Sequence, residues 1–198
     1  MSLAKATQAT VALFGIFFVL VWIIFGFSWL LFFLFLALIF ICRNTNKSIV
    51  CTDPKAILAP IEGEINSIRT VKHQNLGSCI ELSIKNYLYN EGIIRANSRM
   101  QIKEFRLRHG LFSFENKYFN ERAFIIASSN DKLFALRLNL GFLERILKFY
   151  KKQGEFEVGE ELGFSLNSTV DLLLPKDTRL LVAVGDKIKS SSLLGYFS

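Results

Sequence analysis

The chain has 198 residues and a net charge of +7, and 51% of its residues are hydrophobic, including 20 phenylalanines. A hydrophobic share this high is unusual for a wholly soluble protein, and the length allows one domain beside a membrane segment. The basic excess predicts an anionic partner. An anionic bilayer is favoured over nucleic acid because the apolar N-terminus already requires a membrane, so we expect no nucleic-acid partner.

The three cysteines, Cys42, Cys51 and Cys79, are odd in number and widely spaced, without a CxxC motif or a nearby pair of histidines. This pattern argues against a disulfide framework and against a zinc site, so we expect no metal. Reduced thiols in a protein that faces the cytoplasm are the expectation. Acylation of Cys42 at the membrane edge is the alternative.

The first predicted element is the apolar stretch from Val11 to Ile41, which contains no charged residue. It is too long for the core of a signal peptide and lacks a small-x-small cleavage site, so we expect it to be retained. As one helix it would span about 46 Å, against a hydrocarbon core of about 30 Å. It must therefore tilt strongly or fold back, and Gly26-Phe27-Ser28 offers a turn for a shallow helical hairpin.

Basic residues around this stretch predict its orientation. Only Lys5 precedes it, whereas three basic residues follow it closely, at Arg43, Lys47 and Lys55. A single span would then place the following domain in the cytoplasm, and a hairpin would keep both of its ends on one side. We expect a membrane anchor over residues 1–45, in the cell inner membrane, and a cytoplasmic domain over residues 46–198.

The domain behind the anchor is predicted to be mainly β, within an α+β class. Short strands bounded by turn residues are expected at Ile57–Ala59, Glu64–Val71, Cys79–Ile84, Met100–Arg108, Arg122–Ser128 and Lys132–Leu140. One helix is expected over Phe142–Lys152, where apolar residues recur at helical spacing. Ala59–Ile65 and Leu181–Ile188 look like the two halves of a lipoyl-type barrel sandwich, with Gly63 in a tight turn at φ > 0.

The segment from Gly159 to Pro175 makes the interpretation more specific. It contains Ser168, followed by Asp171 and Pro175. With it, the chain resembles the short phosphatidylserine decarboxylases of bacterial and archaeal type, which begin with an apolar hairpin and carry a Gly-Ser-containing stretch followed by an Asp and a Pro. The resemblance covers nearly the whole length, through Arg43, Ala59-Pro60, Gly63, Asn120-Glu121-Arg122, Leu140-Gly141, Ser168 and Val184-Gly185.

The resemblance implies a self-made cofactor. Ser168 would attack the carbonyl of Asn167, and elimination would leave a β-chain of residues 1–167 and an α-chain of residues 168–198 that begins with a pyruvoyl group. That ketone serves as an electron sink for the decarboxylation of phosphatidylserine. The implied partner is an anionic phospholipid such as phosphatidylserine, and a homodimer is compatible with the resemblance.

Three working positions depart from the family pattern. Asn167 replaces the Gly before the Ser, Glu62 replaces the Asp of a Pro-x-Asp-Gly turn, and Leu88 falls where the family has a His. Asn tolerates left-handed geometry better than other non-glycine residues, and Glu keeps a carboxylate. The predicted catalytic residues are therefore Ser168, Asn167 and Glu62, and a displaced base would have to be His73 or His109, the only histidines.

Alternatives remain open on the sequence alone. The chain could be a degenerate family member that binds phospholipid or a partner without turnover, with Ser168 as a hydroxyl bonded to backbone. It could also be an adaptor of a membrane complex, although Lys85–Gly154 lacks the heptads of a coiled-coil hairpin. Basic residues expected to face anionic headgroups, or to form a solvated face, are Arg145, Lys148, Lys151 and Lys152, with Lys103, Arg106, Arg108 and Arg137.

Overall fold

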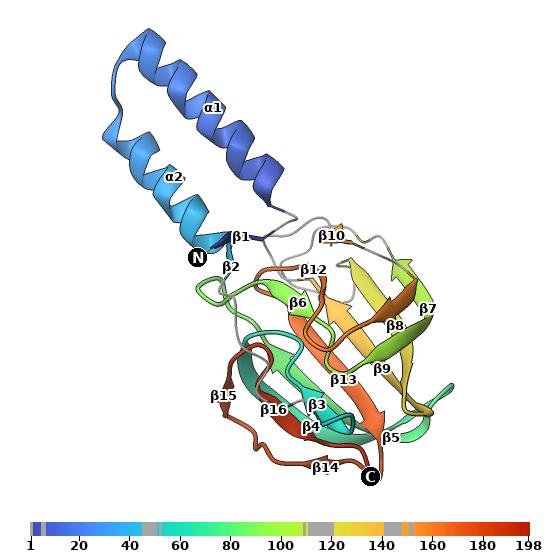
Figure 1. The fold of residues 1–198 in the computed structure, drawn as a ribbon. Helices are drawn as coiled ribbons and strands as arrows, with labels where there is room; N and C mark the ends of the chain where they lie inside the picture. The colour runs from blue at the N-terminus through green and yellow to red at the C-terminus, as the bar shows by residue number, and fades with distance from the viewer. Residues whose placement is uncertain are drawn as a thin grey trace. The chain divides into compact units, whose positions relative to one another are not determined.

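The structure is a computed structural model, which describes residues 2–4, 7–44, 51, 53–108, 110, 121–140, 148–150 and 153–198. The chain forms two compact units, Met1–Asn46 and Lys47–Ser198. The first unit is helical and the second is built from β-strands (Figure 1). The protein is therefore mainly β with an N-terminal pair of apolar helices, as the sequence predicted.

The first unit is a helical hairpin. Helix α1 (Gln8–Phe25) and helix α2 (Trp29–Ile41) are separated at the predicted turn, where Gly26 has φ +84°. Strand β1 (Ser2–Leu3) pairs antiparallel with β2 (Arg43–Asn44) and joins the two ends of the hairpin. Because the chain enters and leaves at the same end, the hairpin form of the prediction is confirmed.

Aromatic rings fill the contact between the two helices. The Phe35 ring stacks on Phe14 and Phe18, with ring centroids 6.1 and 5.9 Å apart, and a side chain at Gly15 would meet the Phe35 ring at 3.4 Å. Apolar residues also cover the outer faces, where Phe25 and Leu30 are 81% and 79% exposed. Helices that are apolar all round need apolar surroundings. Among the described residues, α1 is the one helix long and apolar enough to cross a membrane.

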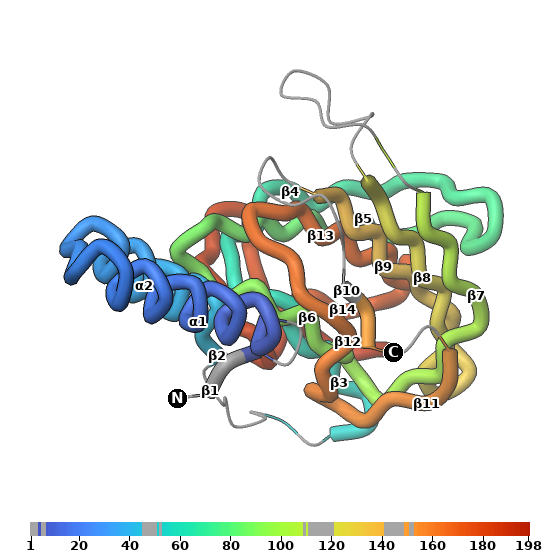
Figure 2. The backbone as a smooth tube through the Cα atoms, turned by 90° about the horizontal axis from the view of Figure 1, so that it is seen from above, coloured from blue at the N-terminus to red at the C-terminus, as the bar shows by residue number. Residues whose placement is uncertain are grey.

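The second unit contains an eight-stranded antiparallel sheet. Its strand order is β11 (Gly154–Phe156), β7 (Met100–Arg108), β8 (Arg122–Ser129), β9 (Lys132–Asn139), β13 (Thr169–Pro175), β5 (Gly77–Lys85), β4 (Gly63–His73), β15 (Lys187–Ile188). Two three-stranded sheets complete the unit. One has the order β10 (Lys148–Phe149), β12 (Glu161–Phe164), β6 (Ile93–Arg95). The other has the order β14 (Arg179–Leu180), β16 (Leu193–Tyr196), β3 (Ala56–Leu58). Figure 2 shows these sheets from above.

The six predicted strands are all confirmed, as β3, β4, β5, β7, β8 and β9. The turn between β8 and β9 is formed by Asn130 and Asp131, both at positive φ, which is the two-residue turn that suits the twist of a hairpin. The described part of Lys85–Gly154 forms strands, so the coiled-coil adaptor alternative has no support in the fold.

The helix predicted over Phe142–Lys152 is wrong where the structure describes it. Lys148 and Phe149 form β10 and pair with β12, and the Tyr150 N–H donates to the Leu162 carbonyl at 3.0 Å. The Phe149 ring packs edge-on against Phe105, with centroids 4.9 Å apart, so tertiary pairing overrides the helical spacing here. Residues 141–147, 151 and 152 lie outside the described residues.

The two segments predicted to be halves of one sandwich do meet. The Ile65 N–H donates to the Asp186 carbonyl at 3.0 Å, and the Gly185 N–H donates to the Ile65 carbonyl at 2.8 Å. Gly185 has φ +92°, but Gly63 does not have a positive φ, so that part of the prediction is wrong. Gly63 is required instead because a side chain there would meet the Lys85 carbonyl oxygen at 2.3 Å.

Strand β13 lies in the middle of the large sheet and is buried on both faces. Val170, Leu172 and Leu174 belong to the main core, whereas Leu173 packs on the opposite face with Cys79, Ile126 and Ala135. A strand covered on both sides reads as a continuous apolar run, here Leu172-Leu173-Leu174. Asp171 interrupts this pattern within the strand, and Ser168 is buried directly before it, so both polar residues need another explanation.

Candidate active site

The turn that precedes β13 holds the first two predicted catalytic residues. Asn167 has φ +50°, in the left-handed region that non-glycine residues rarely adopt, and Ser168 follows with only 1% of its surface exposed. A left-handed residue costs about 1–3 kcal/mol and persists only where the surrounding structure imposes it. The expectation that Asn167 takes the backbone geometry of a glycine is confirmed.

The Ser168 hydroxyl lies in this turn without a hydrogen-bond partner among the described residues. Buried hydroxyls are usually bonded. Five other buried hydroxyls of the described residues, at Ser98, Ser129, Ser165, Thr178 and Ser190, are also unbonded, so this feature alone does not distinguish Ser168. Within that described part, Ser168 is thus not a hydroxyl bonded to backbone.

Asn86 imposes the geometry of the turn. It follows β5 directly and is fully buried, and the pairing of Thr169 with Lys85 brings it beside Ser168. Its Oδ1 accepts a hydrogen bond from the Asn167 N–H at 3.0 Å, and its own N–H donates to the Ser168 carbonyl at 2.9 Å. Asn86 therefore bonds to the backbone on both sides of the Asn167–Ser168 peptide bond, through its side chain and through its own N–H.

The other end of the Asn86 amide reaches the third predicted residue. Nδ2 donates to the Glu62 carbonyl at 2.8 Å and to the Glu91 carbonyl at 3.0 Å. Asn86 thus joins the turn before β4, the turn before β13 and the loop before β6, and we call these contacts the Asn86 bridge. The sequence marked Asn86 only as a turn residue that ends a strand, because its partners are 24 and 81 positions away.

The Glu62 side chain is half-buried and faces a small cavity of about 170 Å³. Lys187 and Lys189 line the same cavity with Tyr87 and Tyr89, whose rings stack with centroids 5.5 Å apart. Glu64 lines it as well, so this cavity combines two carboxylates with two ammonium groups and aromatic surface. It suits a ligand that carries charges of both signs.

The position of the family histidine is occupied by Leu88, which lies in the turn from Tyr87 to Asn90 and is 38% exposed. Neither histidine of the chain is shown to replace it. His73 ends β4, about 36 Å along the strand from Glu62 at ordinary strand rise, and its ring stacks on Phe124 with centroids 5.2 Å apart. This distance excludes His73 as a displaced base. His109 lies outside the described residues.

Some predicted membrane-facing residues are also beyond what the structure describes. Arg145, Lys151 and Lys152 lie outside the described residues, and of Lys148 only the backbone, in β10, is described. Their proposed role stays a prediction. Arg106, Arg108 and Arg137, in contrast, lie together on strands β7 and β9.

Fold and turn define a class: an antiparallel β protein with an apolar hairpin and a buried serine after a left-handed residue. The family model for phosphatidylserine decarboxylase matches residues 36–196. The chain therefore belongs to the phosphatidylserine decarboxylase family.

Individual relatives agree with this assignment. A phosphatidylserine decarboxylase proenzyme of Carboxydothermus hydrogenoformans is 30% identical over 80% of this chain and 78% of the relative. Those of Desulfotalea psychrophila and Burkholderia cenocepacia are 28% and 25% identical, over 72% and 86% of this chain and 71% and 83% of the relatives. No solved structure matches the chain.

Proposed function

We propose that the protein converts phosphatidylserine to phosphatidylethanolamine with a pyruvoyl group made from its own Ser168. The observation that carries the proposal is the turn at Asn167 and Ser168, where a left-handed residue precedes a buried serine and both are held by Asn86. The relatives are named phosphatidylserine decarboxylase proenzymes, which supports both the reaction and a cleaved precursor.

Self-cleavage begins with the Ser168 hydroxyl. Its oxygen attacks the carbonyl carbon of Asn167, and the C–N bond breaks, which leaves an ester to Oγ and a free amino group on Ser168. Loss of the Ser168 Cα proton then expels Asn167 as a carboxylate. Water replaces the nitrogen of the remaining dehydroalanine and releases ammonia, so residue 168 ends as a ketone at the start of the α-chain.

The Asn86 bridge contributes by positioning. Its bonds to the Asn167 N–H and the Ser168 carbonyl hold the scissile peptide from both sides, at 3.0 and 2.9 Å. Correct placement of reacting atoms accounts for a large part of most rate enhancements. Cleavage also releases the conformational cost of the left-handed Asn167, about 1–3 kcal/mol, which the folded precursor stores.

The Asn86 bridge bonds the backbone carbonyls of two acidic residues, Glu62 and Glu91. The Glu91 carboxylate pairs with Arg95, so we assign proton transfer to the carboxylate of Glu62. Once formed, the pyruvoyl group supplies the electron sink for loss of carbon dioxide. The phosphatidylserine headgroup carries an amine, a carboxylate and a phosphate. The cavity of Glu62, Lys187 and Lys189 offers a carboxylate for the amine and ammonium groups for the anionic parts.

A lipid substrate explains the helical hairpin. By length α1 and α2 extend about 27 and 20 Å, against about 30 Å for the hydrocarbon core, so the hairpin suits insertion from one side. The pairing of β1 with β2 keeps both of its ends together. We propose that the protein lies at the inner membrane with residues 47–198 on the cytoplasmic side.

Intact-mass measurement of the purified protein tests the cleavage. Wild type should yield two chains, one that ends at Asn167 and one that begins at residue 168. Ser168→Ala should remain one chain of 22.6 kDa. Ser165→Ala is the matched control, because Ser165 is also fully buried and its hydroxyl is also unbonded among the described residues. It should cleave like wild type. One uncleaved species in all three proteins would contradict the proposal.

Activity is measured as phosphatidylethanolamine formed from phosphatidylserine vesicles, with phosphatidylcholine vesicles as the blank. Glu62→Gln should slow cleavage by about 10²–10⁴-fold, the usual contribution of a proton-transfer group. Glu155→Gln, an exposed change on β11, is its control. Leu88→His should raise the cleavage rate, because it returns a titratable ring to the turn beside Glu62. Equal cleavage by Glu62→Gln and wild type would remove Glu62 from the mechanism.

A further inference from the structure

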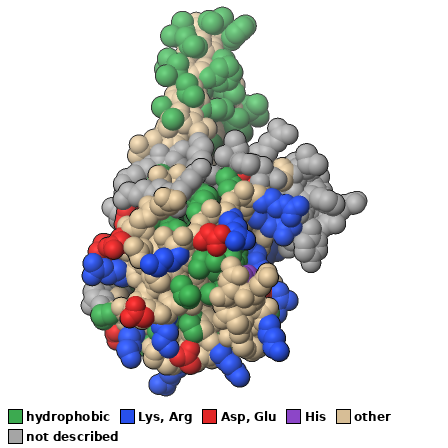
Figure 3. Space-filling model, turned by 90° about the vertical axis from the view of Figure 1, so that its right-hand side faces the viewer, with side chains coloured by type: hydrophobic (Ala, Val, Ile, Leu, Met, Phe, Trp, Pro, Cys, Tyr) green, Lys and Arg blue, Asp and Glu red, His purple; other side chains and the backbone are tan. Residues whose placement is uncertain are grey.

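The Asn86 bridge ends on the carbonyl of Glu91, whose side chain belongs to a buried ion pair. Figure 3 shows charged side chains of both signs at the surface of the molecule. Glu91 and Arg95 are instead only 1% and 9% exposed, and the Arg95 Nη2 lies 3.2 Å from the Glu91 Oε1. A buried pair is often no more stabilising than apolar side chains of the same volume, and its best-attested use is to specify one arrangement of the chain. The arrangement that this pair specifies is therefore the question.

The guanidinium of Arg95 joins two segments of the chain. Glu91 lies in the loop before β6, and Arg95 is the last residue of β6. On its other side, Arg95 Nη1 donates to the Gly159 carbonyl at 3.4 Å and lies 4.0 Å from Glu161 Oε1. Glu161 is also the residue directly opposite Arg95 in the pairing of β12 with β6. Arg95 thus connects the loop before β6 with the start of the strand that leads to the cleavage turn.

Two contacts carry the position of this loop to the scissile peptide. The Gly92 carbonyl accepts a hydrogen bond from the Ser165 N–H at 2.8 Å, and a side chain at Gly92 would meet the Ser165 carbonyl oxygen at 2.7 Å. The Glu91 carbonyl accepts from Asn86 Nδ2 at 3.0 Å, and Asn86 Oδ1 accepts from the Asn167 N–H at 3.0 Å. A shift of the loop would therefore displace both ends of the segment before Ser168.

We propose that Glu91 and Arg95 are positioning residues for self-cleavage at Ser168. Their ion pair fixes the loop of Glu91 and Gly92, and the loop sets the place of the cleavage turn through Asn86 and Ser165. This inference rests on the proposed function and extends it to charged groups that act at a distance from the reacting atoms. A displacement of about 1 Å caused by a distant change costs about 10²-fold in rate.

The first measurement is the rate of cleavage of newly made precursor, followed by pulse-labelled cell-free translation with phosphatidylcholine nanodiscs. Glu91→Gln and Arg95→Gln should each slow cleavage by about 10–10²-fold. Arg95→Lys keeps a positive charge for Glu91 and should recover part of the rate. The control pair is Arg99 and Glu157, which are 3.5 Å apart but 70% and 73% exposed. Arg99→Gln and Glu157→Gln should cleave like wild type, because exposed pairs contribute little.

The second measurement is amide hydrogen exchange of residues 163–169 in uncleaved Ser168→Ala protein. Glu91→Gln in this background should speed exchange of the Ser165 and Asn167 amides by at least about 10-fold, while β8 and β9 exchange as before. A general loss of stability would speed exchange in β8 and β9 as well. Because Glu91→Gln keeps the size of the side chain, it carries both comparisons if Arg95→Gln does not fold.

Unchanged exchange in residues 163–169, or cleavage of Glu91→Gln as fast as that of Glu157→Gln, would overturn the proposal. A uniform rise of exchange in all strands would do the same, since the pair would then support the whole unit. If wild type does not cleave, the proposed function fails, whereas the exchange measurement still decides whether Glu91 and Arg95 position the turn.

Discussion

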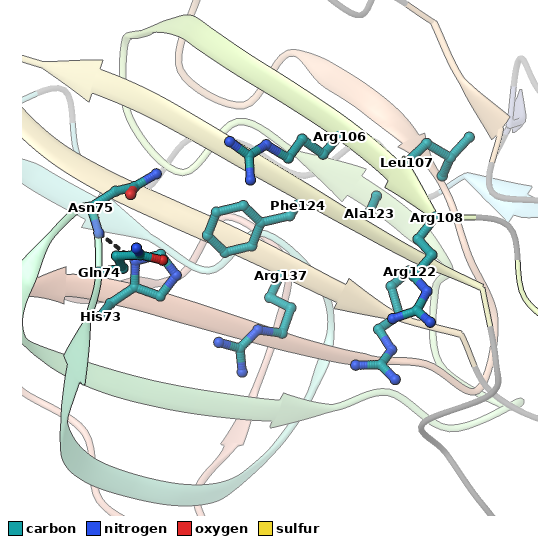
Figure 4. A pocket seen from close by; sticks show the side chains of 10 residues that line it. All are labelled: His73, Gln74, Asn75, Arg106, Leu107, Arg108, Arg122, Ala123, Phe124 and Arg137. Atoms are coloured by element: carbon teal, nitrogen blue, oxygen red, sulfur yellow. Dashed lines mark hydrogen bonds between the residues drawn. The ribbon is translucent and has the colours of Figure 1, made fainter.

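The Asn86 bridge lies at the end of β5 beside the turn before β13, whereas the cavity lined by Arg106, Arg108, Arg122 and Arg137, here called the arginine cavity, lies over β7, β8 and β9 of the same large sheet (Figure 4). The two sites are opposite in character. Asn86 is neutral and fully buried, and both polar atoms of its side chain have hydrogen-bond partners within 3.0 Å. The cavity is open and is lined by four arginines, of which Arg106 and Arg137 pair with carboxylates. Buried neutral hydrogen bonds determine geometry, whereas charges open to solvent are screened by salt.

The largest expected effect is at the centre of the bridge. Asn86→Leu removes three side-chain hydrogen bonds and leaves the Asn167 N–H and two carbonyls buried without that partner. In the uncleaved Ser168→Ala background, which keeps every protein compared as one chain, we expect the free energy of unfolding to fall by about 3–5 kcal/mol, measured by urea denaturation in detergent. Asn66→Leu, an exposed change on β4, should stay within about 0.5 kcal/mol. A similar loss of unfolding free energy in both variants would show that the Asn86 hydrogen bonds stabilise the protein no more than an exposed residue does.

A smaller effect should come from the left-handed residue that the bridge holds. Asn167→Val places a branched side chain at φ +50° and should lower the free energy of unfolding by about 1–3 kcal/mol. Asn167→Gly should equal or exceed wild type in stability, because glycine adopts this backbone without a steric cost. The same urea experiment measures both. A stable Asn167→Val protein would mean that the turn is not held in this geometry.

On the other face, burial raises the pKa of Asp171, while hydrogen bonds from Ser83 and Asn139 and the charge of Arg137 oppose the shift. A carboxyl whose pKa is raised by folding binds a proton more tightly in the folded state. The free energy of unfolding therefore increases as pH falls from above the raised pKa toward the ordinary value of about 3.9.

Asp171→Asn removes this titration. The stability difference between wild type and variant should shift in favour of wild type as pH is lowered through that window, in thermal melts taken at each pH. A difference that does not change with pH would show that Asp171 keeps an ordinary pKa.

The smallest expected effect tests the repulsion within the arginine cavity, where Arg108 lies directly opposite Arg122. At low salt, Arg108→Gln should raise the free energy of unfolding by about 0.2–1 kcal/mol, and added sodium chloride should reduce the gain. Arg179→Gln, an exposed arginine outside the cavity, should give no gain. If Arg108→Gln destabilises the protein at low salt, Arg108 and Arg122 are compensated by groups within the chain.

Local patterns explain what could be predicted. The uncharged run from Val11 to Ile41 predicted a membrane anchor by hydrophobicity alone, as either a tilted span or a hairpin, and Gly26 is the turn at which the structure forms the hairpin. Alternation and turn residues specify the meander from β7 to β9. The left-handed backbone at Asn167 was expected from the resemblance, because Asn is a tolerated substitute for glycine there.

Sequence patterns gave wrong predictions where contacts with residues distant in the chain determine the local structure. Lys148 and Phe149 had helical spacing, but β12 offered a strand partner and Phe105 a ring contact. Gly63 had the sequence context of a turn glycine, but the close Lys85 carbonyl is what excludes a side chain. Both outcomes depend on groups far along the chain.

The sequence by itself determined an apolar N-terminal segment and a β-rich domain, since these follow from local composition and order, and its resemblance to a family predicted Ser168 as the cleaved serine. Only the tertiary structure decided that Asn86 joins Glu62, Asn167 and Ser168, and that four arginines share one cavity. The physical reason is that hydrogen bonds and charges act through space, and strand register, which brings residues 86 and 168 together, is a property of the whole sheet.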